Sequence, residues 1–120
     1  MYSDLILALY NNPPHFGPLR EKTATHTMNN PSCGDVLTVD MNIDAEHGKV
    51  IDMTFYGESC AITRAAAALL ADHIIGKKTE QIAQMNVETM YELIGSKIHP
   101  GRVKCLLLPL ENVKYIIQNS

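Results

Sequence analysis

The sequence has no tryptophan and only two phenylalanines, and it also lacks long apolar runs. Its longest apolar stretches, 65–71 and 105–110, are far shorter than the roughly 20 residues needed to cross a bilayer, so we expect no membrane span. The opening MYSDLILALYNN has an acidic residue where a secretory signal carries a basic region, which predicts a native first helix. With 46% hydrophobic and 19% charged residues, the composition is typical of a globular protein and argues against disorder.

Blocks of basic residues are missing as well. The chain carries 10 Lys and Arg against 13 Asp and Glu, a net charge of -3, so we expect no nucleic-acid partner. Cysteine is scarce and odd in number, with three residues far apart and no Cys-x-x-Cys pair. A disulfide framework calls for an even count and an oxidising compartment. The cysteines are therefore expected to be reduced thiols of a cytoplasmic protein.

The hydrophobic pattern changes period along the chain, which predicts the fold class. A length of 120 residues suits one domain, 1–120, and the order is helix, strands and then helices. This order predicts an α+β fold: a small antiparallel sheet with helices packed on one face. The first expected helix is capped by Ser3, and the second covers 60–76. Two short helices are expected, one from 79 and one over 87–95. The last expected helix covers 100–118 and loses one internal hydrogen bond at Pro109. The expected strands are 22–28, 35–43 and 49–56, with Gly48 in the turn between the last two.

The first two cysteines fall at predicted element boundaries. Cys33 lies in the loop before the second strand, and Asp35 follows two residues later, a spacing that points both side chains to one side of an extended chain. Cys60 begins the alanine-rich helix, where the helix dipole and unsatisfied backbone N–H groups favour a thiolate. Both cysteines are candidates for anionic sulfur.

The third cysteine, Cys105, lies in the first turns of the last helix beside Lys104 and three residues after Arg102, so cationic charge is available near its sulfur. Three thiolates and one carboxylate form a set that a four-coordinate zinc ion accepts, and thiolates also hold iron–sulfur clusters. However, intervals of 27 and 45 residues between the cysteines are not those of a zinc finger or ribbon. From these residues alone, three separately buried cysteines remain an alternative to a shared metal site.

Three motifs in order carry a family resemblance: NPSCGD (30–35), GESCAIT (57–63) and PGRVKC (100–105), preceded by LYNNPPHFGPL (9–19). They resemble the cysteine motifs of the IscU/SufU/NifU N-terminal family of iron–sulfur cluster assembly proteins. The resemblance implies a three-stranded antiparallel sheet with helices on one face. It also implies a zinc or [2Fe-2S] site formed by Cys33, Asp35, Cys60 and Cys105. Its implied partners are a pyridoxal-phosphate cysteine desulfurase, which donates persulfide sulfur, and recipient apo iron–sulfur proteins.

Two functions within this family remain open. IscU scaffolds usually have His where this chain has Lys104, whereas PGRVKC resembles the SufU branch; the interval between Cys60 and Cys105 lacks the insertion typical of SufU. The chain is therefore expected to be a cluster assembly scaffold or, alternatively, a zinc-dependent sulfurtransferase. Cys33 and Cys105 are the candidate persulfide acceptors. A purely structural zinc site is a third reading.

Overall fold

The structure is a computed structural model that describes residues 2–31 and 34–119. Its strands are β1 (Ala24–Asn30), β2 (Asp35–Asp44) and β3 (Lys49–Tyr56). Its helices are α1 (Asp4–Asn11), α2 (Ala61–Ile74), α3 (Thr79–Ala83), α4 (Val87–Ile94) and α5 (Val103–Gln118), and a short 3₁₀ turn, η1 (Pro100–Arg102), precedes α5. None of the helices in these described residues is long and apolar enough to span a membrane.

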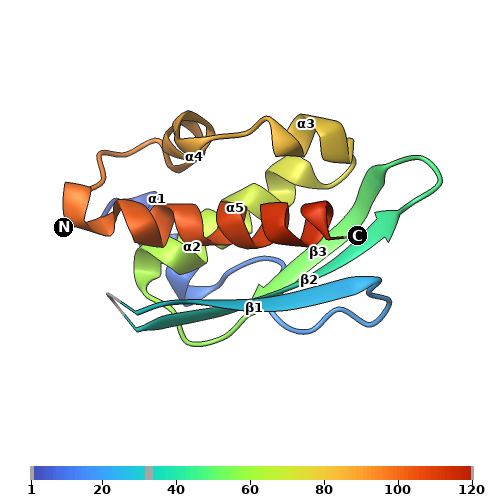
Figure 1. Ribbon diagram of the computed structural model, residues 1–120. Helices are drawn as coiled ribbons and strands as arrows, with labels where there is room; N and C mark the ends of the chain where they lie inside the picture. Colours follow the sequence, from blue (N-terminus) through green and yellow to red (C-terminus); the bar gives the residue numbers. More distant parts are fainter. Residues whose placement is uncertain (1, 32–33, 120) are drawn as a thin grey trace.

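The three strands form one antiparallel sheet in the order β1-β2-β3, and the helices cover one of its faces (Figure 1). The predicted α+β architecture is confirmed. Helix α5 packs on β1 and β2, while α2 packs on α5 and β3. The first strand covers 24–30 instead of the predicted 22–28, because its pairing with β2 begins at Ala24 opposite Met41.

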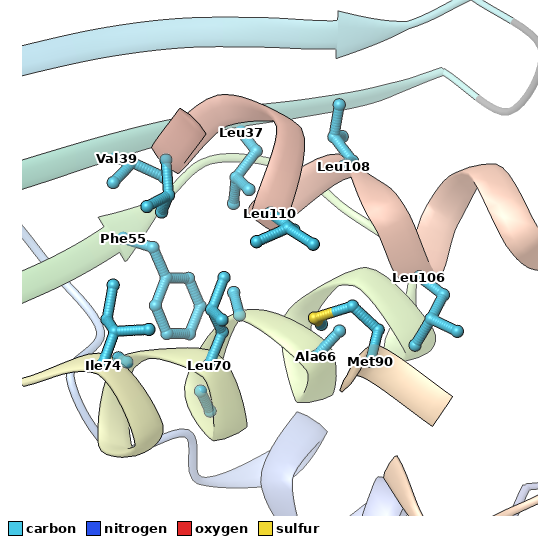
Figure 2. Packing of buried hydrophobic residues seen from close by; sticks show 14 of the residues in the cluster. Leu37, Val39, Phe55, Ala66, Leu70, Ile74, Met90, Leu106, Leu108 and Leu110 are labelled. Atoms are coloured by element: carbon cyan, nitrogen blue, oxygen red, sulfur yellow. The ribbon is translucent and has the colours of Figure 1, made fainter. Parts of the chain in front are cut away.

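The core lies between the sheet and the helices and is mainly aliphatic (Figure 2). Leu37 and Val39 of β2 and Phe55 of β3 point at Leu70 of α2 and Leu110 of α5, and all of them are buried. Small alanines on α2 let this helix approach its neighbours closely. Helices α2 and α5 thus pack on the sheet through the same core.

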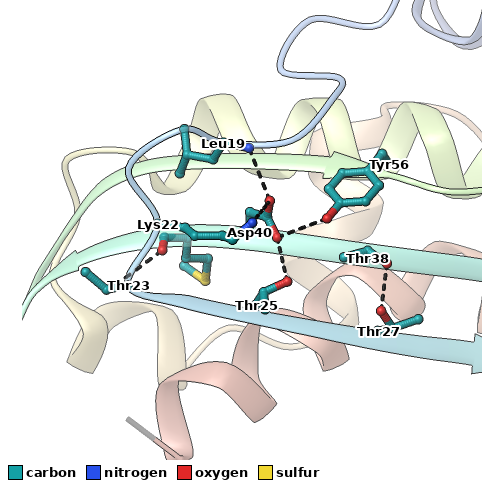
Figure 3. Close-up of polar contacts among 9 residues, drawn as sticks. Leu19, Lys22, Thr23, Thr25, Thr27, Thr38, Asp40 and Tyr56 are labelled. Atoms are coloured by element: carbon teal, nitrogen blue, oxygen red, sulfur yellow. Dashed lines mark hydrogen bonds and ion pairs between the residues drawn. The ribbon is translucent and has the colours of Figure 1, made fainter.

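The opposite face of the sheet holds a buried carboxylate, Asp40, which is fully enclosed (Figure 3). Its oxygens accept hydrogen bonds from the backbone N–H of Leu19 at 3.1 Å and the hydroxyl of Thr25 at 2.5 Å. The ammonium of Lys22 lies 3.6 Å away. A buried carboxylate is tolerated when it is paired in this way, and the contacts tie the segment before β1 to the sheet.

Candidate metal centre

Three of the four predicted ligands lie together at one end of the molecule. Asp35 is the first residue of β2, Cys60 immediately precedes α2, and Cys105 lies in the first turn of α5. One carboxylate oxygen and the two sulfur atoms all lie within 4.8 Å of one another. The fourth predicted ligand, Cys33, lies outside the described residues.

A tight turn after β3 brings Cys60 to Asp35. Gly57 has φ +126°, and a Cβ atom there would lie 2.3 Å from the carbonyl oxygen of Val36. Only glycine allows this approach of two backbones without strain. The N–H of Val36 donates to the carbonyl of Glu58 at 2.8 Å, which fastens the turn to the start of β2.

The N-terminus of α2 supplies hydrogen bonds to both the carboxylate and the thiol. Cys60 is the N-cap residue, and its sulfur accepts the N–H of Thr63 at 3.5 Å. The N–H of Cys60 donates to Asp35 Oδ1 at 2.8 Å. Because helix N-termini favour negative charge, this position suits anionic ligands and agrees with the predicted placement of Cys60.

The hydroxyl of Thr63 contacts all three described ligand residues, which the sequence did not predict. It donates to Asp35 Oδ2 at 2.7 Å, lies 3.0 Å from the carbonyl oxygen of Cys105, and is 3.4 Å from the sulfur of Cys60. Thr63 is fully buried. The available signal was its spacing, since a residue three positions after an N-cap faces that cap across the first turn.

A cation also lies beside the site, as the sequence indicated. Arg102 Nη1 is 3.9 Å from the sulfur of Cys105, and the hydrogen bond to this sulfur raises the pKa of the Arg102 guanidinium above its ordinary value. Lys104 is exposed and lines a separate cavity, together with Glu111. Of these two cations, Arg102 is the one in hydrogen-bonding contact with a candidate ligand.

A cavity of about 500 Å³ adjoins the centre on the side of Arg102, and Tyr2 and His99 also line it. His99 lies six residues before Cys105 in the sequence. In the structure its Nδ1 accepts the N–H of Gly101 at 3.0 Å, so this nitrogen caps η1. The lining of the cavity includes Arg102 but none of the three described candidate ligands.

The donor set fits a thiophilic cation. Asp35 is 2% exposed and Cys105 1%, and both face the sulfur of Cys60. Zinc binds thiolates and carboxylates in tetrahedral sites, and iron accepts the same ligands, whereas magnesium and calcium favour oxygen alone. Two sulfurs and a carboxylate that converge from three elements are thus suited to zinc or iron.

Comparison with known proteins identifies the family of this chain. The family model described as NifU-like N terminal domain matches residues 1–119. The chain belongs to the NifU-like N-terminal domain family. This membership places it among the scaffold proteins of iron–sulfur cluster assembly and confirms the family predicted from the three cysteine motifs.

Relatives of this NifU-like chain carry two different names. The iron–sulfur cluster assembly scaffold protein IscU of Thermotoga maritima is 32% identical over 95% of this chain and 90% of its own length. The zinc-dependent sulfurtransferase SufU of Bacillus subtilis is 35% identical over 90% of this chain and 83% of its own length. Sequence identity therefore does not choose between the two branches.

Solved structures of NifU-like proteins share the fold. A crystal structure described as a cluster assembly scaffold protein for the SUF system, from Fervidobacterium islandicum AW-1, has a TM-score of 0.83 and 26% identity. The match covers 97% of this chain and 96% of that chain. The N-terminal NifU-like protein of Brucella abortus has a TM-score of 0.76 and covers 97% of this chain.

Proposed function

We propose that this chain is an iron–sulfur cluster assembly scaffold that accepts sulfur from a cysteine desulfurase. It would hold iron, a [2Fe-2S] cluster or zinc through Cys33, Asp35, Cys60 and Cys105. The observation that carries the proposal is the convergence of the carboxylate of Asp35 with the sulfurs of Cys60 and Cys105 within 4.8 Å. Asp35 suits a site that must release its iron or cluster, because a carboxylate holds soft iron less firmly than a thiolate does.

Sulfur would arrive as a persulfide on the desulfurase. A thiolate of Cys33 or Cys105 attacks the terminal sulfur, a new S–S bond forms on this chain, and the desulfurase cysteine leaves as a thiolate. Conversion of the bound sulfur to sulfide then needs two electrons, which an added dithiol can supply. Arg102 is suited to this step because a guanidinium within hydrogen-bonding reach stabilises anionic sulfur.

The test is anaerobic reconstitution with ferrous iron, cysteine, a dithiol and a cysteine desulfurase, followed by visible absorption and acid-labile sulfide. We expect a cluster that is lost when Cys33, Cys60 or Cys105 is changed to Ser. Met28→Leu is a control outside the proposed ligand set. A protein that forms the same cluster without any one of the three thiols would contradict the proposed ligand set.

A zinc-dependent sulfurtransferase is the second candidate function. One observation supports it: a relative that is 35% identical over 90% of this chain is named zinc-dependent sulfurtransferase. When bound, zinc would hold thiolates deprotonated until a partner displaces one of them. If reconstitution yields no cluster while the zinc-loaded protein increases desulfurase turnover, this function replaces the scaffold.

Arg102→Gln tests the sulfur-acceptance step that both functions share. Removal of the guanidinium should slow persulfide acceptance from the desulfurase about tenfold, the size of one lost hydrogen bond to a charged group. Arg20→Gln, at an exposed position outside the centre, is the matched control. Single-turnover transfer of labelled sulfur measures the rate, and an unchanged rate in Arg102→Gln would remove Arg102 from the step.

A further inference from the structure

We propose that Thr63 is a positioning residue whose hydroxyl holds the Asp35 carboxylate in the orientation that binds metal and links it to the start of α5. This inference rests on the proposed ligand set. Thr63 touches groups of all three described ligand residues: the carboxylate of Asp35, the sulfur of Cys60 and the carbonyl of Cys105.

The carboxylate of Asp35 is held at both oxygens by donors from the N-terminus of α2. The N–H of Cys60 donates to Oδ1 at 2.8 Å, and the hydroxyl of Thr63 donates to Oδ2 at 2.7 Å. An ionised carboxylate has about four lone-pair sites, more than these two donors occupy. Donors on two different oxygens set the plane of the group, and this plane determines where its lone pairs point.

A proline explains why the same hydroxyl also reaches α5. In a regular helix the carbonyl of Cys105 would accept the N–H of residue 109, but this residue is Pro109, which has no N–H. Thr63 Oγ1 lies 3.0 Å from this carbonyl and can donate to it. A hydroxyl has one hydrogen, so the carboxylate of Asp35 and the carbonyl of Cys105 share or compete for it.

The geometry gives Thr63 two separable contributions. One is structural, because its hydroxyl can donate to the carbonyl of Cys105, to which Pro109 offers no N–H. The other is toward the metal, because it orients a ligand. Partners that orient ligands typically alter metal affinity about ten- to a hundredfold when they are removed.

Thr63→Val removes the hydroxyl and keeps the size of the side chain, whereas Thr63→Ser keeps the hydroxyl. We expect Thr63→Val to weaken Zn²⁺ binding about ten- to a hundredfold in competition with a chromophoric chelator. We expect Thr63→Ser to bind Zn²⁺ as the parent does. With Co²⁺ as the probe, Thr63→Val should also change the ligand-field spectrum, which a purely structural role would leave alone once the site is saturated.

Thr25→Val is the matched control, since Thr25 makes the same kind of hydrogen bond to the buried carboxylate of Asp40 on the other face of the sheet. It should lower the stability of the metal-free protein without changing Zn²⁺ affinity. Pro109→Ala restores an N–H for the carbonyl of Cys105. In the double variant Thr63→Val/Pro109→Ala we therefore expect stability to recover while Zn²⁺ affinity stays low.

A double-mutant cycle with Asp35→Ala tests whether Thr63 acts on Zn²⁺ affinity through Asp35. If Thr63 acts through Asp35, Thr63→Val changes Zn²⁺ affinity no further once the carboxylate is gone. An equal loss with and without Asp35, or a return of affinity in Thr63→Val/Pro109→Ala, overturns the inference and leaves the ligand set standing. If Asp35→Ala itself leaves Zn²⁺ affinity unchanged, the proposed ligand set fails, and the inference fails with it.

Discussion

At the scale of single residues, Asp35 carries two tasks. It is a candidate metal ligand, and it also accepts hydrogen bonds from Cys60 N–H and the hydroxyl of Thr63. Its removal would therefore take away these hydrogen bonds as well as a candidate ligand. Asp35→Asn separates the tasks, because the amide oxygen can still accept from Cys60 and the amide nitrogen can donate to Thr63.

For Asp35→Asn we expect the unfolding free energy of the metal-free protein to change by less than about 1.5 kcal/mol, the net value of a typical hydrogen bond. Metal affinity should fall more than about tenfold, because a neutral amide replaces a carboxylate ligand. Urea unfolding and chelator competition measure the two quantities. An equal Zn²⁺ affinity in parent and variant would remove Asp35 from the ligand set.

A histidine outside the site provides a pH prediction. Burial lowers the pKa of His73 from its ordinary value of 6.5, and nearby Lys77 lowers it further, while Glu92 partly opposes this. The folded protein thus binds the proton less readily than the unfolded chain, so stability is fully present above about pH 6.5 and declines as the pH falls through the folded pKa.

His73→Gln should therefore lose less stability than the parent between about pH 7 and about pH 5. The difference is small, because the side chain is only partly buried. Thermal melting of parent and variant at both pH values measures it. A larger stability loss in His73→Gln than in the parent would contradict a lowered pKa of His73 in the folded protein.

Individual residues also show which parts of the site the sequence predicts. Cys60 and Cys105 lie at helix starts as their spacing indicated, and Arg102 reaches the sulfur of Cys105. The contact of Thr63 with Asp35 was not predictable in the same way. It depends on how the first turn of α2 meets the start of β2 in the folded chain, and no local pattern specifies that meeting.

At the scale of elements, the helices and strands were largely predictable, because caps and alternation are local. Ser3 caps α1 as expected, and α4, expected over 87–95, is capped by Asn86 and ends at Gly95 in a left-handed conformation. The apolar face of β3 was ambiguous, because Val50 and Ile51 both continue an apolar pattern. The structure resolves this with a register shift opposite Asn42 and Ile43, which buries Val50 and leaves Ile51 50% exposed.

The turn after β3 is the element whose geometry the site needs most. Gly57→Ala would place a Cβ atom 2.3 Å from the carbonyl oxygen of Val36 at φ +126°. We expect a loss of about 2 kcal/mol or more of unfolding free energy, from backbone strain and steric overlap together. Metal affinity should fall as well, since the turn sets Cys60 against Asp35.

Gly17→Ala is the matched control for this prediction. Gly17 has φ +116° but no atom within 4 Å of the added Cβ, so this variant carries the strain without the overlap. Urea unfolding of both variants should show the larger loss in Gly57→Ala. Equal losses would mean that the close approach to Val36 is not a constraint on the fold.

At the scale of the whole molecule, the candidate ligands come from three separate elements that meet at one end of the fold. Asp35 begins β2, Cys60 precedes α2 and Cys105 lies in the first turn of α5. A metal ion that bridges them binds the folded chain more tightly than the unfolded one. Binding and folding are therefore coupled.

Zn²⁺ should accordingly stabilise the protein against heat. At free Zn²⁺ about a hundredfold above the dissociation constant, the added stability is about 2.7 kcal/mol. Removal of the metal with a chelator should reverse it, and Cys60→Ser should lose most of it. Calorimetry with and without Zn²⁺ measures the effect, and an unchanged melting temperature in the parent would exclude a bridging site.

X-ray absorption spectroscopy of the zinc-loaded protein reports the ligand set itself. We predict a four-coordinate Zn²⁺ with three sulfur ligands at about 2.3 Å and one oxygen ligand at about 2.0–2.2 Å. The sulfurs would belong to Cys33, Cys60 and Cys105 and the oxygen to Asp35. A first shell without sulfur, or with one sulfur only, would contradict a shared centre built from these residues.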